Sequence, residues 1–387
     1  MSGFGFSEGQ NMLRQVVKDF AQKEIAPGVR DRQKMDLPTL EKELRKIDKK
    51  MVDMGWMALN APEKYGGTPI DHVSIGVIVE ELGKVDTSVL GPQPTIAASA
   101  LLRNLPEEVQ DEWFAAIINC DKRMAYGFTE PEAGSDAGSI TTRAVRDGDY
   151  YIINGEKAPM PGGIFADAIS LSATIDPSLG AKGVTMFFVP TDTPGVTATP
   201  IPWLGNNHMF PSSVMLDDVR IPAKYREGEE GKGFSLVMGT FDWLRNIIVL
   251  QQLGSAMASL EEAMVWAKQR IAFKKPIAKF EGVSFMIAEH VTKVDAARLL
   301  CYRALWLRDQ GLPHMKETSM AKWFSVQTAI DAINAAMVVH GWYGYSKEHL
   351  IESRLRDALG FQYADGPTNI QKLIIARELM GKDAQPY

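Results

Sequence analysis

The chain has 387 residues, 45% of them hydrophobic, so it is long enough to bury two or three separately packed cores. Its 48 acidic residues exceed its 42 basic residues, which gives a formal net charge of -6. Nucleic-acid binding needs clustered Lys and Arg, and we find no basic stripe interleaved with aromatic residues, so nucleic acid is excluded as a partner. The chain has no run of about 18 apolar residues, and residues 1–4 lack the features of a signal peptide, so we expect a cytoplasmic protein that does not enter a membrane.

The cysteines and histidines give no sign of a disulfide framework or a metal centre. Only two cysteines occur, Cys120 and Cys301, and they are far apart in the sequence. The six histidines are scattered, and His290, His340 and His349 do not have the spacing of metal ligands. We therefore expect no metal site.

The first third of the chain is predicted to be helical. From about residue 7 to residue 123, apolar residues recur at helical spacing, while the charged segment 41–46 is typical of an exposed helix surface. Breaks are expected at Ala26-Pro27, at residues 65–67 and at Gly91-Pro92, because proline and glycine end or kink helices.

Near residue 124 the pattern changes from helical spacing to short β-rich runs. Turns rich in Gly, Pro and Asp separate these runs up to about residue 230, and Asp147-Gly148 predicts a hairpin. Strands are expected at residues 150–153, 183–189 and 214–216. After Gly233 helical spacing returns, with long helices expected at residues 246–270, 283–310, 315–339 and 368–380.

The segment 129–136, with the sequence Thr-Glu-Pro-Glu-Ala-Gly-Ser-Asp, carries the clearest chemical signal. Its small and hydroxyl residues, Thr129, Gly134 and Ser135, allow a backbone to approach a flat polar ring closely and to donate hydrogen bonds to its carbonyls and phosphates. The predicted hairpin and the segment 154–157 follow directly. This combination indicates a flavin-binding loop.

The same stretch resembles the acyl-CoA dehydrogenase family, and the resemblance covers nearly the whole chain. Six further blocks follow in the order of that family, at residues 217–222, 228–234, 241–245, 269–277, 340–345 and 374–379. The resemblance implies an α+β fold in three domains: an N-terminal α-helical domain (1–123), a middle β-barrel (124–232) and a C-terminal four-helix bundle (233–387).

The resemblance also implies a glutamate base, placed just before the last helix in a Tyr-Glu-Gly-Thr motif. The segment 363–368 falls at that motif, so Asp365 stands in place of the glutamate. Its carboxylate is withdrawn by roughly one C–C bond, about 1.5 Å, which can cost on the order of 100-fold unless the pocket or substrate moves. In the alternative interpretation this segment is only a turn, whose Asp365 caps the helix that begins near Thr368. A second base position of the family, just before Arg245, holds Leu244.

For the cofactor, the resemblance implies FAD. It places the flavin on the β domain, at Tyr126, Phe128, Thr129, Gly134 and Ser135. From a neighbouring subunit it adds two residues at the adenosine and pyrophosphate end, Arg270 and Phe273. The guanidinium group of Arg270 suits a phosphate, and it can equally be an exposed charge at the end of a helix.

Several positions depart from the family pattern. Pro159 and Pro161 stand where a tryptophan and a threonine normally contact the flavin, and proline offers neither an indole face, nor a hydroxyl, nor an N–H donor. Val338 and Trp342 replace a glutamine and a glycine, and Pro367 replaces a threonine. These departures leave open a flavin held differently, slower exchange with an electron carrier, or a subunit that has lost its cofactor.

For the substrate, the resemblance implies that Ser135, Asp242 and Arg245 lie along coenzyme A. Asp242 and Arg245 are three residues apart, so they can also form an ordinary ion pair on a helix. The segment 91–99 is expected to line the acyl pocket. Its small side chains and prolines leave room for a branched or alicyclic acyl group, or they only permit close helix packing.

These expectations combine into an FAD-dependent acyl-CoA dehydrogenase in which Asp365 takes the α proton and flavin N5 takes the β hydride. The resemblance implies a homotetramer that electron-transferring flavoprotein reoxidises. Two alternatives stay open. One is another acyl-CoA reaction in the same fold, an elimination or an enoyl-CoA reduction. The other is a flavin-poor partner subunit of a mixed tetramer.

Overall fold

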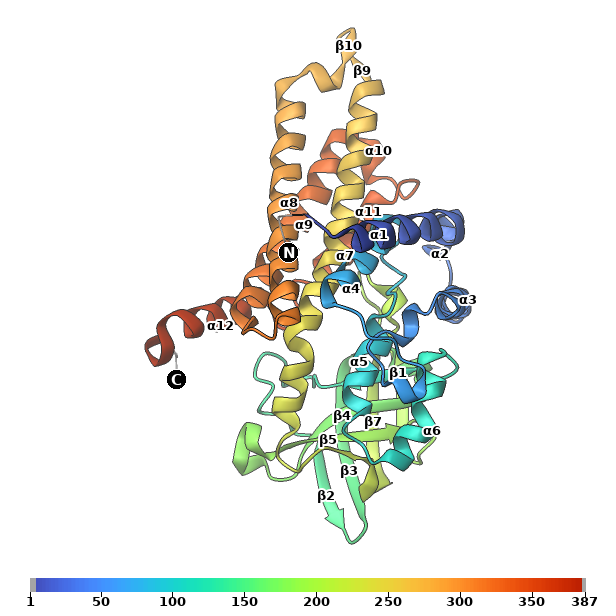
Figure 1. Ribbon diagram of the computed structural model, residues 1–387, viewed down its shortest axis with the longest axis vertical. Helices are drawn as coiled ribbons and strands as arrows, with labels where there is room; N and C mark the ends of the chain where they lie inside the picture. Colours follow the sequence, from blue (N-terminus) through green and yellow to red (C-terminus); the bar gives the residue numbers. More distant parts are fainter. Residues whose placement is uncertain (1–4, 385–387) are drawn as a thin grey trace. The chain divides into compact units, whose positions relative to one another are not determined.

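The computed structural model describes residues 5–384, and the chain divides into two compact units (Figure 1). The first unit contains residues up to 35, residues 70–91 and the chain from residue 242 onward. The second unit contains residues 36–69 and 92–241. Residues 1–4, to which the expectation about a signal peptide refers, lie outside the described part.

The first unit begins with a capped helix. In α1 (Glu8–Phe20) the Ser7 hydroxyl accepts the Gln10 backbone N–H at 3.2 Å, and the Gln10 side chain accepts the Ser7 N–H at 3.0 Å. This reciprocal pair satisfies two backbone donors that a helix start leaves free. The predicted break at Ala26-Pro27 is confirmed as a short 3₁₀ turn, Ala26–Gly28. After α2 (Val29–Arg32), the almost entirely buried α4 (His72–Val85) packs against α1.

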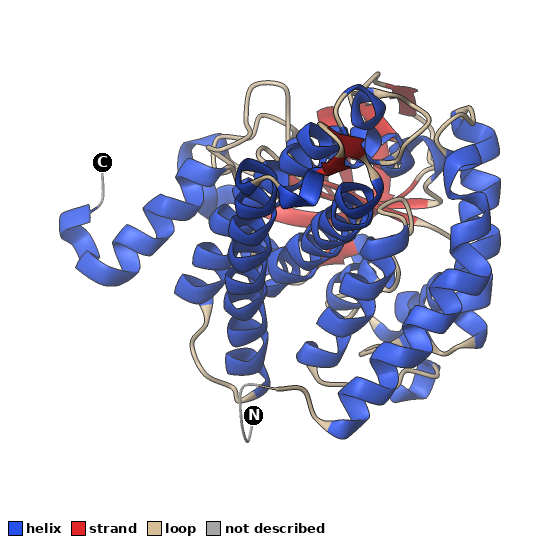
Figure 2. Cartoon of the chain, turned by 90° about the horizontal axis from the view of Figure 1, so that it is seen from above, coloured by secondary structure: helices blue, strands red, loops and turns tan. Residues whose placement is uncertain are grey.

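Helices, three of them longer than 25 residues, form most of the rest of the first unit (Figure 2). They are α7 (Gly233–Gln269), which starts in the second unit, α8 (Glu281–Asp309), α9 (Met315–His340), α10 (Trp342–Tyr345), α11 (Ile351–Gly360) and α12 (Thr368–Met380). The predicted helices are confirmed, although α7 begins well before residue 246 and therefore includes the motif at 241–245. By length and composition α7 could cross a membrane, but 59% of its most apolar window is buried in the protein, as in a core helix. The hairpin of β9 (Ile271–Ala272) and β10 (Lys275–Pro276) joins α7 to α8 (Figure 1).

The second unit combines three helices with an eight-stranded sheet. The helices are α3 (Leu37–Asp53), α5 (Gln93–Leu102) and α6 (Glu107–Ile118). The strands are β1 (Met124–Gly127), β2 (Arg143–Asp147), β3 (Tyr150–Pro161), β4 (Ala168–Thr174), β5 (Val184–Pro190), β6 (Val196–Pro200), β7 (Pro211–Pro222) and β8 (Arg226–Glu227). Their order in the sheet is β6-β7-β3-β2-β4-β5-β8, and β1 pairs with β4 in parallel.

The predicted hairpin is confirmed. Asp147 on β2 pairs with Tyr150 on β3, and Gly148 takes a φ of 59°, which glycine adopts without steric cost. The sheet buries one core among its own strands, including Tyr151, Leu171 and Phe187. A second core, which includes Ala168 and Phe188, packs against α5 and α6 through residues such as Leu102 and Phe114. The predicted order of helical, β and helical regions is therefore confirmed, while the domain limits at 123/124 and 232/233 stay predictions.

Candidate active site

Asp365 lies in a tight turn directly before α12. Its backbone takes a left-handed φ of 55°, and Gly366 follows with a φ of 89°. Aspartate tolerates this conformation better than most residues that carry a side chain. The first helical residue of α12 is Thr368, its N-cap is Pro367, and no side chain of the described residues caps it. The structure thus has a turn at this segment, as the alternative interpretation expects. The expectation that Asp365 caps α12 is wrong, because Asp365 lies two residues before the N-cap, Pro367.

The backbone of this turn is held by two buried side chains. Arg245, on α7, donates from Nε to the Asp365 carbonyl at 2.8 Å. Gln371, on α12, donates from Nε2 to the carbonyls of Asp365 at 3.4 Å and Gly366 at 3.1 Å. Among the described residues, no hydrogen bond or ion pair holds the Asp365 carboxylate. The turn is therefore fixed through its carbonyls, which leaves the carboxylate available.

A third buried side chain, Lys322 on α9, supports the same turn. Its Nζ donates to the Phe361 carbonyl at 2.6 Å, and only 1% of the residue is exposed. Burial lowers the pKa of Lys322 to about 8, and the nearby Asp365 carboxylate opposes that shift. We did not predict Lys322 or Gln371 from the sequence. The available signal was a lysine within the apolar pattern of α9, since lysine is seldom fully buried unless it has a partner.

Asp242, predicted to bind coenzyme A, lies one helical turn before Arg245 on α7. Its Oδ2 is 2.9 Å from Nε2 of His314, at the start of α9. Its Oδ1 is buried and has no hydrogen-bond partner among the described residues. The structure therefore brings Asp242, Arg245 and Asp365 together within the first unit, because Asp242 and Arg245 lie one turn apart on α7 and Arg245 binds the Asp365 carbonyl.

The predicted flavin loop of the second unit is anchored by a buried ion pair. Lys157 Nζ lies 2.7 Å from Glu130 Oε1, and Glu130 also accepts backbone N–H groups from Thr141 at 2.6 Å and Thr142 at 3.0 Å. Burial alone would raise the pKa of Glu130, but the Lys157 charge and these hydrogen bonds outweigh it and lower the pKa to about 2. The pair is therefore ionised at neutral pH, and it holds the start of the loop against β3.

Beyond this anchor the loop is open to solvent. Gly134 and Ser135 are exposed, and a Cβ added at Gly134 would meet no atom of the described residues within 4 Å, its chain neighbours apart. The rings of Tyr126 and Phe128 are stacked, with centroids 6.5 Å apart, and the Tyr126 hydroxyl donates to the Pro94 carbonyl at 2.6 Å. Small exposed loop residues and a pair of stacked aromatic rings are both features that suit a flat ring system, so this part of the chain fits a flavin.

The two prolines that depart from the family pattern lie at the C-terminal end of β3. Pro159 and Pro161 are exposed, while the alternating Ala158 and Met160 are buried. The strands β3 and β7 shift register between Lys157 and Met160. The prolines therefore present carbon surface at positions from which they cannot donate a hydrogen bond.

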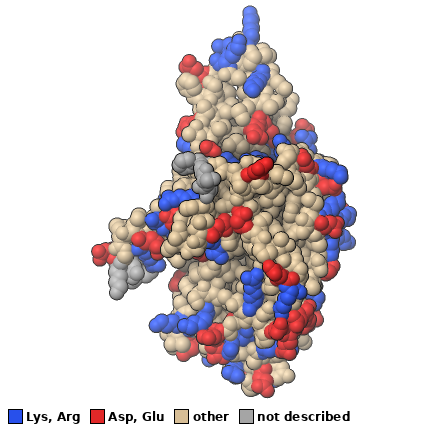
Figure 3. Space-filling view, in the orientation of Figure 1, with Lys and Arg blue, Asp and Glu red and all other residues tan. Residues whose placement is uncertain are grey.

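The remaining predicted flavin residues, Arg270 and Phe273, belong to the first unit. Phe273 is 90% exposed at the tip of the β9–β10 hairpin and takes a φ of 49°. Arg270 is exposed at the end of α7, and basic side chains gather around this hairpin (Figure 3). Lys275 lies over the Phe280 ring at 4.2 Å. An exposed ring among cations is suited to a nucleotide with its phosphates.

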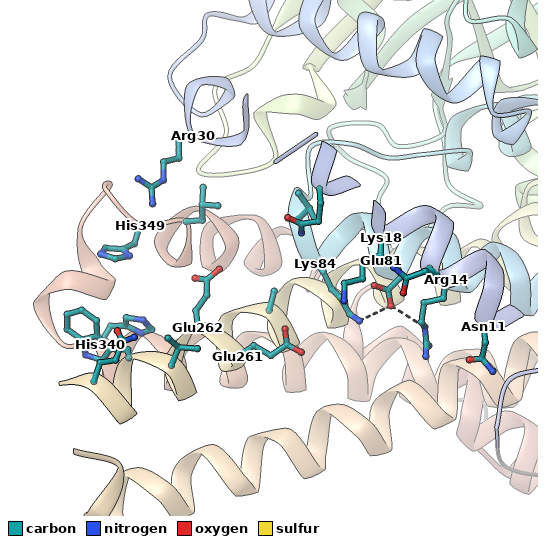
Figure 4. A pocket seen from close by; sticks show the side chains of 18 residues that line it. Asn11, Arg14, Lys18, Arg30, Glu81, Lys84, Glu261, Glu262, His340 and His349 are labelled. Atoms are coloured by element: carbon teal, nitrogen blue, oxygen red, sulfur yellow. Dashed lines mark hydrogen bonds and ion pairs between the residues drawn. The ribbon is translucent and has the colours of Figure 1, made fainter. Parts of the chain in front are cut away.

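A pocket of about 880 Å³ opens elsewhere in the first unit, among α1, α4, α7 and residues 340–350 (Figure 4). On one side Arg14 and Lys84 both pair with Glu81, at 3.2 Å and 2.7 Å. On another side His340 stacks on Trp266, with ring centroids 5.3 Å apart. None of the predicted site residues lines this pocket.

Comparison with known proteins identifies the class of enzyme. Three family models match in order along the chain: the acyl-CoA dehydrogenase N-terminal domain at residues 7–121, the middle domain at 125–219 and the C-terminal domain at 231–380. The chain belongs to the acyl-CoA dehydrogenase family and has its fold, with an N-terminal helical, a middle β and a C-terminal helical domain.

Individual relatives align with nearly the whole length of this chain. A probable acyl-CoA dehydrogenase of Bacillus subtilis, YngJ, is 36% identical and aligns over 97% of this chain and 99% of its own. CarC, a subunit of the caffeyl-CoA reductase–Etf complex of Acetobacterium woodii, is 34% identical over 97% of this chain and 100% of its own. The structure of butyryl-CoA dehydrogenase from Megasphaera elsdenii matches with a TM-score of 0.88 and 31% identity, over 98% of this chain and 100% of that one.

These similarities establish the activity at the level of the family. The chain is a flavin-dependent oxidoreductase of the acyl-CoA dehydrogenase type, with FAD as cofactor and an acyl-CoA as substrate. Homologues form complexes with electron-transferring flavoprotein.

Proposed function

We propose that this chain removes hydrogen from the α and β carbons of an acyl-CoA thioester, with Asp365 as the base that takes the α proton. The observation that supports the proposal is the arrangement of the turn: its carbonyls are bound by Arg245 and Gln371, while the carboxylate is unpaired among the described residues. A general base has to be positioned and yet free to receive a proton.

The cofactor supplies the acceptor for the β hydride when it is bound, at flavin N5. The protein supplies the base and its position. Because Asp365 is one methylene shorter than glutamate, its carboxylate can reach the α carbon only if the turn is held close to the substrate, and Arg245 on α7 provides that restraint. The buried charge of Lys322 stabilises the same segment through the Phe361 carbonyl.

We assign the FAD contacts as the sequence predicts. Tyr126, Phe128, Thr129, Gly134 and Ser135 would lie along the flavin and its nearer phosphate. Their support is the open, glycine-containing loop anchored by the buried pair of Glu130 and Lys157.

At the other end of the cofactor, Arg270 and Phe273 of a second copy of the chain would hold the pyrophosphate and adenosine in a homotetramer. The support is their exposure on a cationic hairpin, with Phe273 almost fully exposed. Trp342, which is 81% exposed beside Tyr345 with ring centroids 5.5 Å apart, adds apolar surface at the end of α9 that an assembly would cover.

For the substrate we propose contacts between coenzyme A and Ser135, Asp242 and Arg245, and an acyl group of branched or alicyclic shape. The buried Oδ1 of Asp242, which no donor in residues 5–384 reaches, supports this proposal. The segment at the start of α5 is almost entirely buried, and Ala98 within it packs in the helix–sheet core. Some of the small side chains in this segment therefore permit close packing, as the alternative interpretation of 91–99 expects.

The second candidate function is the reverse reaction, reduction of an enoyl-CoA. The similarity to CarC, whose name describes a reductase in complex with Etf, favours this candidate. The same base would then act as the acid that delivers the α proton. Electron-transferring flavoprotein would exchange electrons with the flavin in either direction.

A panel of acyl-CoA and enoyl-CoA thioesters, mixed anaerobically with the purified protein, tests the proposal. An acyl-CoA that bleaches the oxidised flavin and loses two hydrogens by mass supports dehydrogenation. Reoxidation of the dithionite-reduced protein by an enoyl-CoA alone would support the reverse reaction. A protein that is colourless when expressed alone would favour the flavin-poor partner subunit and contradict both.

A further inference from the structure

A chain of polar side chains runs from Asp242 through three helices of the first unit. Asp242 on α7 contacts His314, whose Nε2 is 3.3 Å from Nη1 of Arg308 at the end of α8. Arg308 Nε donates to Nε2 of His72 on α4 at 2.9 Å. His72 Nδ1 lies 2.6 Å from Oδ1 of Asp309. The Trp243 ring packs edge-on against His72, with centroids 4.6 Å apart.

The partners of His72 fix its protonation. Arg308 can only donate, so His72 Nε2 must accept with its lone pair. Asp309 also accepts the backbone N–H groups of His72 at 2.8 Å and Val73 at 3.2 Å. Burial would raise the pKa of Asp309, but the hydrogen bonds that it accepts from His72 and Val73 lower it. Asp309 is therefore a carboxylate, and His72 is neutral with its proton on Nδ1.

The partners of His314 fix the proton on Nδ1 but are compatible with Nε2 either protonated or unprotonated. Nδ1 is 2.9 Å from the Leu312 carbonyl, which only accepts, so Nδ1 carries a proton. Nε2 faces an acceptor, Asp242 Oδ2 at 2.9 Å, and a donor, Arg308 Nη1 at 3.3 Å. With a proton on Nε2, His314 is an imidazolium that binds Asp242. Without that proton its lone pair accepts from Arg308 and repels the Asp242 oxygen.

The shorter of the two distances selects the imidazolium, because two unprotonated acceptors do not approach to 2.9 Å. In this state Asp242 Oδ2 is occupied, and Oδ1 is buried with no donor within the described part of the chain. The charged groups around His314 are Asp242 from α7 and Arg308 from α8, with His72 from α4 and Asp309 behind Arg308. The imidazolium thus binds Asp242 Oδ2 and leaves Oδ1 available to a ligand.

We propose that His314 is a positioning residue, which as the imidazolium holds Asp242 so that Oδ1 accepts an amide N–H of the pantetheine arm of coenzyme A. The inference rests on the proposed function in taking Asp242 as a coenzyme A contact. Pantetheine carries amide N–H groups, which are the kind of donor that a buried carboxylate oxygen requires. Without its Nε2 proton, His314 cannot hold Asp242 in this way, so Asp242 is free to turn and the affinity for coenzyme A falls.

The test is isothermal titration of coenzyme A into the FAD-loaded, full-length protein at about pH 6 and about pH 8.5. We expect affinity to fall about tenfold more between these pH values in the wild type than in His314→Gln, whose amide cannot change charge. His290→Gln, a histidine on α8 outside the polar chain, is the matched control and should follow the wild type. Comparing variants at the same pH cancels the titration of coenzyme A itself.

The outcomes separate the two proposals. Equal pH dependence in the wild type and in His314→Gln overturns the role of His314. Asp242→Asn is measured beside them; if it leaves affinity unchanged at the lower pH, the contact between Asp242 and coenzyme A is wrong. Anaerobic flavin bleaching by acyl-CoA tests dehydrogenation independently of both. If His314→Gln does not fold, His314→Asn serves in its place, and Arg308→Met, which removes the competing donor, should flatten the pH dependence.

Discussion

Glu227, on the short strand β8, offers a sharp test of the electrostatics of the second unit. Its carboxyl is 1% exposed and accepts one hydrogen bond, from the Ser170 hydroxyl to Oε2 at 2.7 Å. Oε1 is buried and has no partner among the described residues. Burial, partly offset by Ser170, raises the pKa of Glu227 from 4.5 to about 8. The perturbation we choose is Glu227→Gln, which keeps the shape and cannot ionise.

The sign follows from proton binding. Between pH 4.5 and about 8 the folded chain keeps the Glu227 proton, while the unfolded chain releases it. The free energy of unfolding therefore falls as pH rises through this interval, by about 1.4 kcal/mol per pH unit. The interval sets an upper limit of about 5 kcal/mol on the loss. Glu227→Gln does not pay this penalty, so its stability relative to the wild type should rise with pH.

Urea unfolding followed by far-ultraviolet circular dichroism at about pH 5, 7 and 8.5 measures the difference. We expect near-equal stability at the lowest pH and a variant more stable by several kcal/mol at the highest, up to the limit of about 5. Glu132→Gln, an exposed glutamate on the flavin loop, is the matched control and should show no such trend. A stability difference between Glu227→Gln and the wild type that stays constant over this pH range would show that Glu227 does not keep its proton in the folded chain.

Two further variants test the supports of the site. Lys157→Met removes the partner of the buried Glu130 carboxylate. We therefore expect the free energy of unfolding in urea to fall by about 3 to 5 kcal/mol, and the flavin content per protomer to fall as well. Unchanged flavin content would show that the ion pair does not anchor the loop. Arg245→Lys keeps the charge but loses the planar group that binds the Asp365 carbonyl. Flavin reduction should therefore slow about 10- to 100-fold, with little change in the free energy of unfolding. If Arg245 had a purely structural role, the variant would mainly lose stability.

The sequence predicted the large-scale organisation because its signals are local. The hairpin at Asp147-Gly148, the strands around it and the long C-terminal helices follow from hydrophobic spacing and turn residues, and the structure confirms them. The start of α7 was placed too late, since Gly233 and Gly239 weaken a helical pattern that tertiary packing nevertheless maintains.

The site was predictable only in part. Family motifs pointed to Asp242, Arg245 and Asp365, and these do lie close together in the first unit. The supports of the turn were missed although a lysine within the apolar pattern of α9 indicated a buried residue, because the partner of Lys322, the Phe361 carbonyl, lies 39 residues away in the sequence. The pairing of Asp242 with His314 joins positions 72 residues apart, so sequence spacing could not reveal it.

Single-turnover flavin reduction measures whether Asp365 takes the α proton. The acyl-CoA that bleaches the wild-type flavin fastest is mixed anaerobically with FAD-loaded Asp365→Asn, which keeps the size of the side chain but not its basicity. We expect bleaching slower by at least about 100-fold, with coenzyme A affinity retained. Bleaching of Asp365→Asn as fast as that of the wild type would mean that Asp365 is not the base.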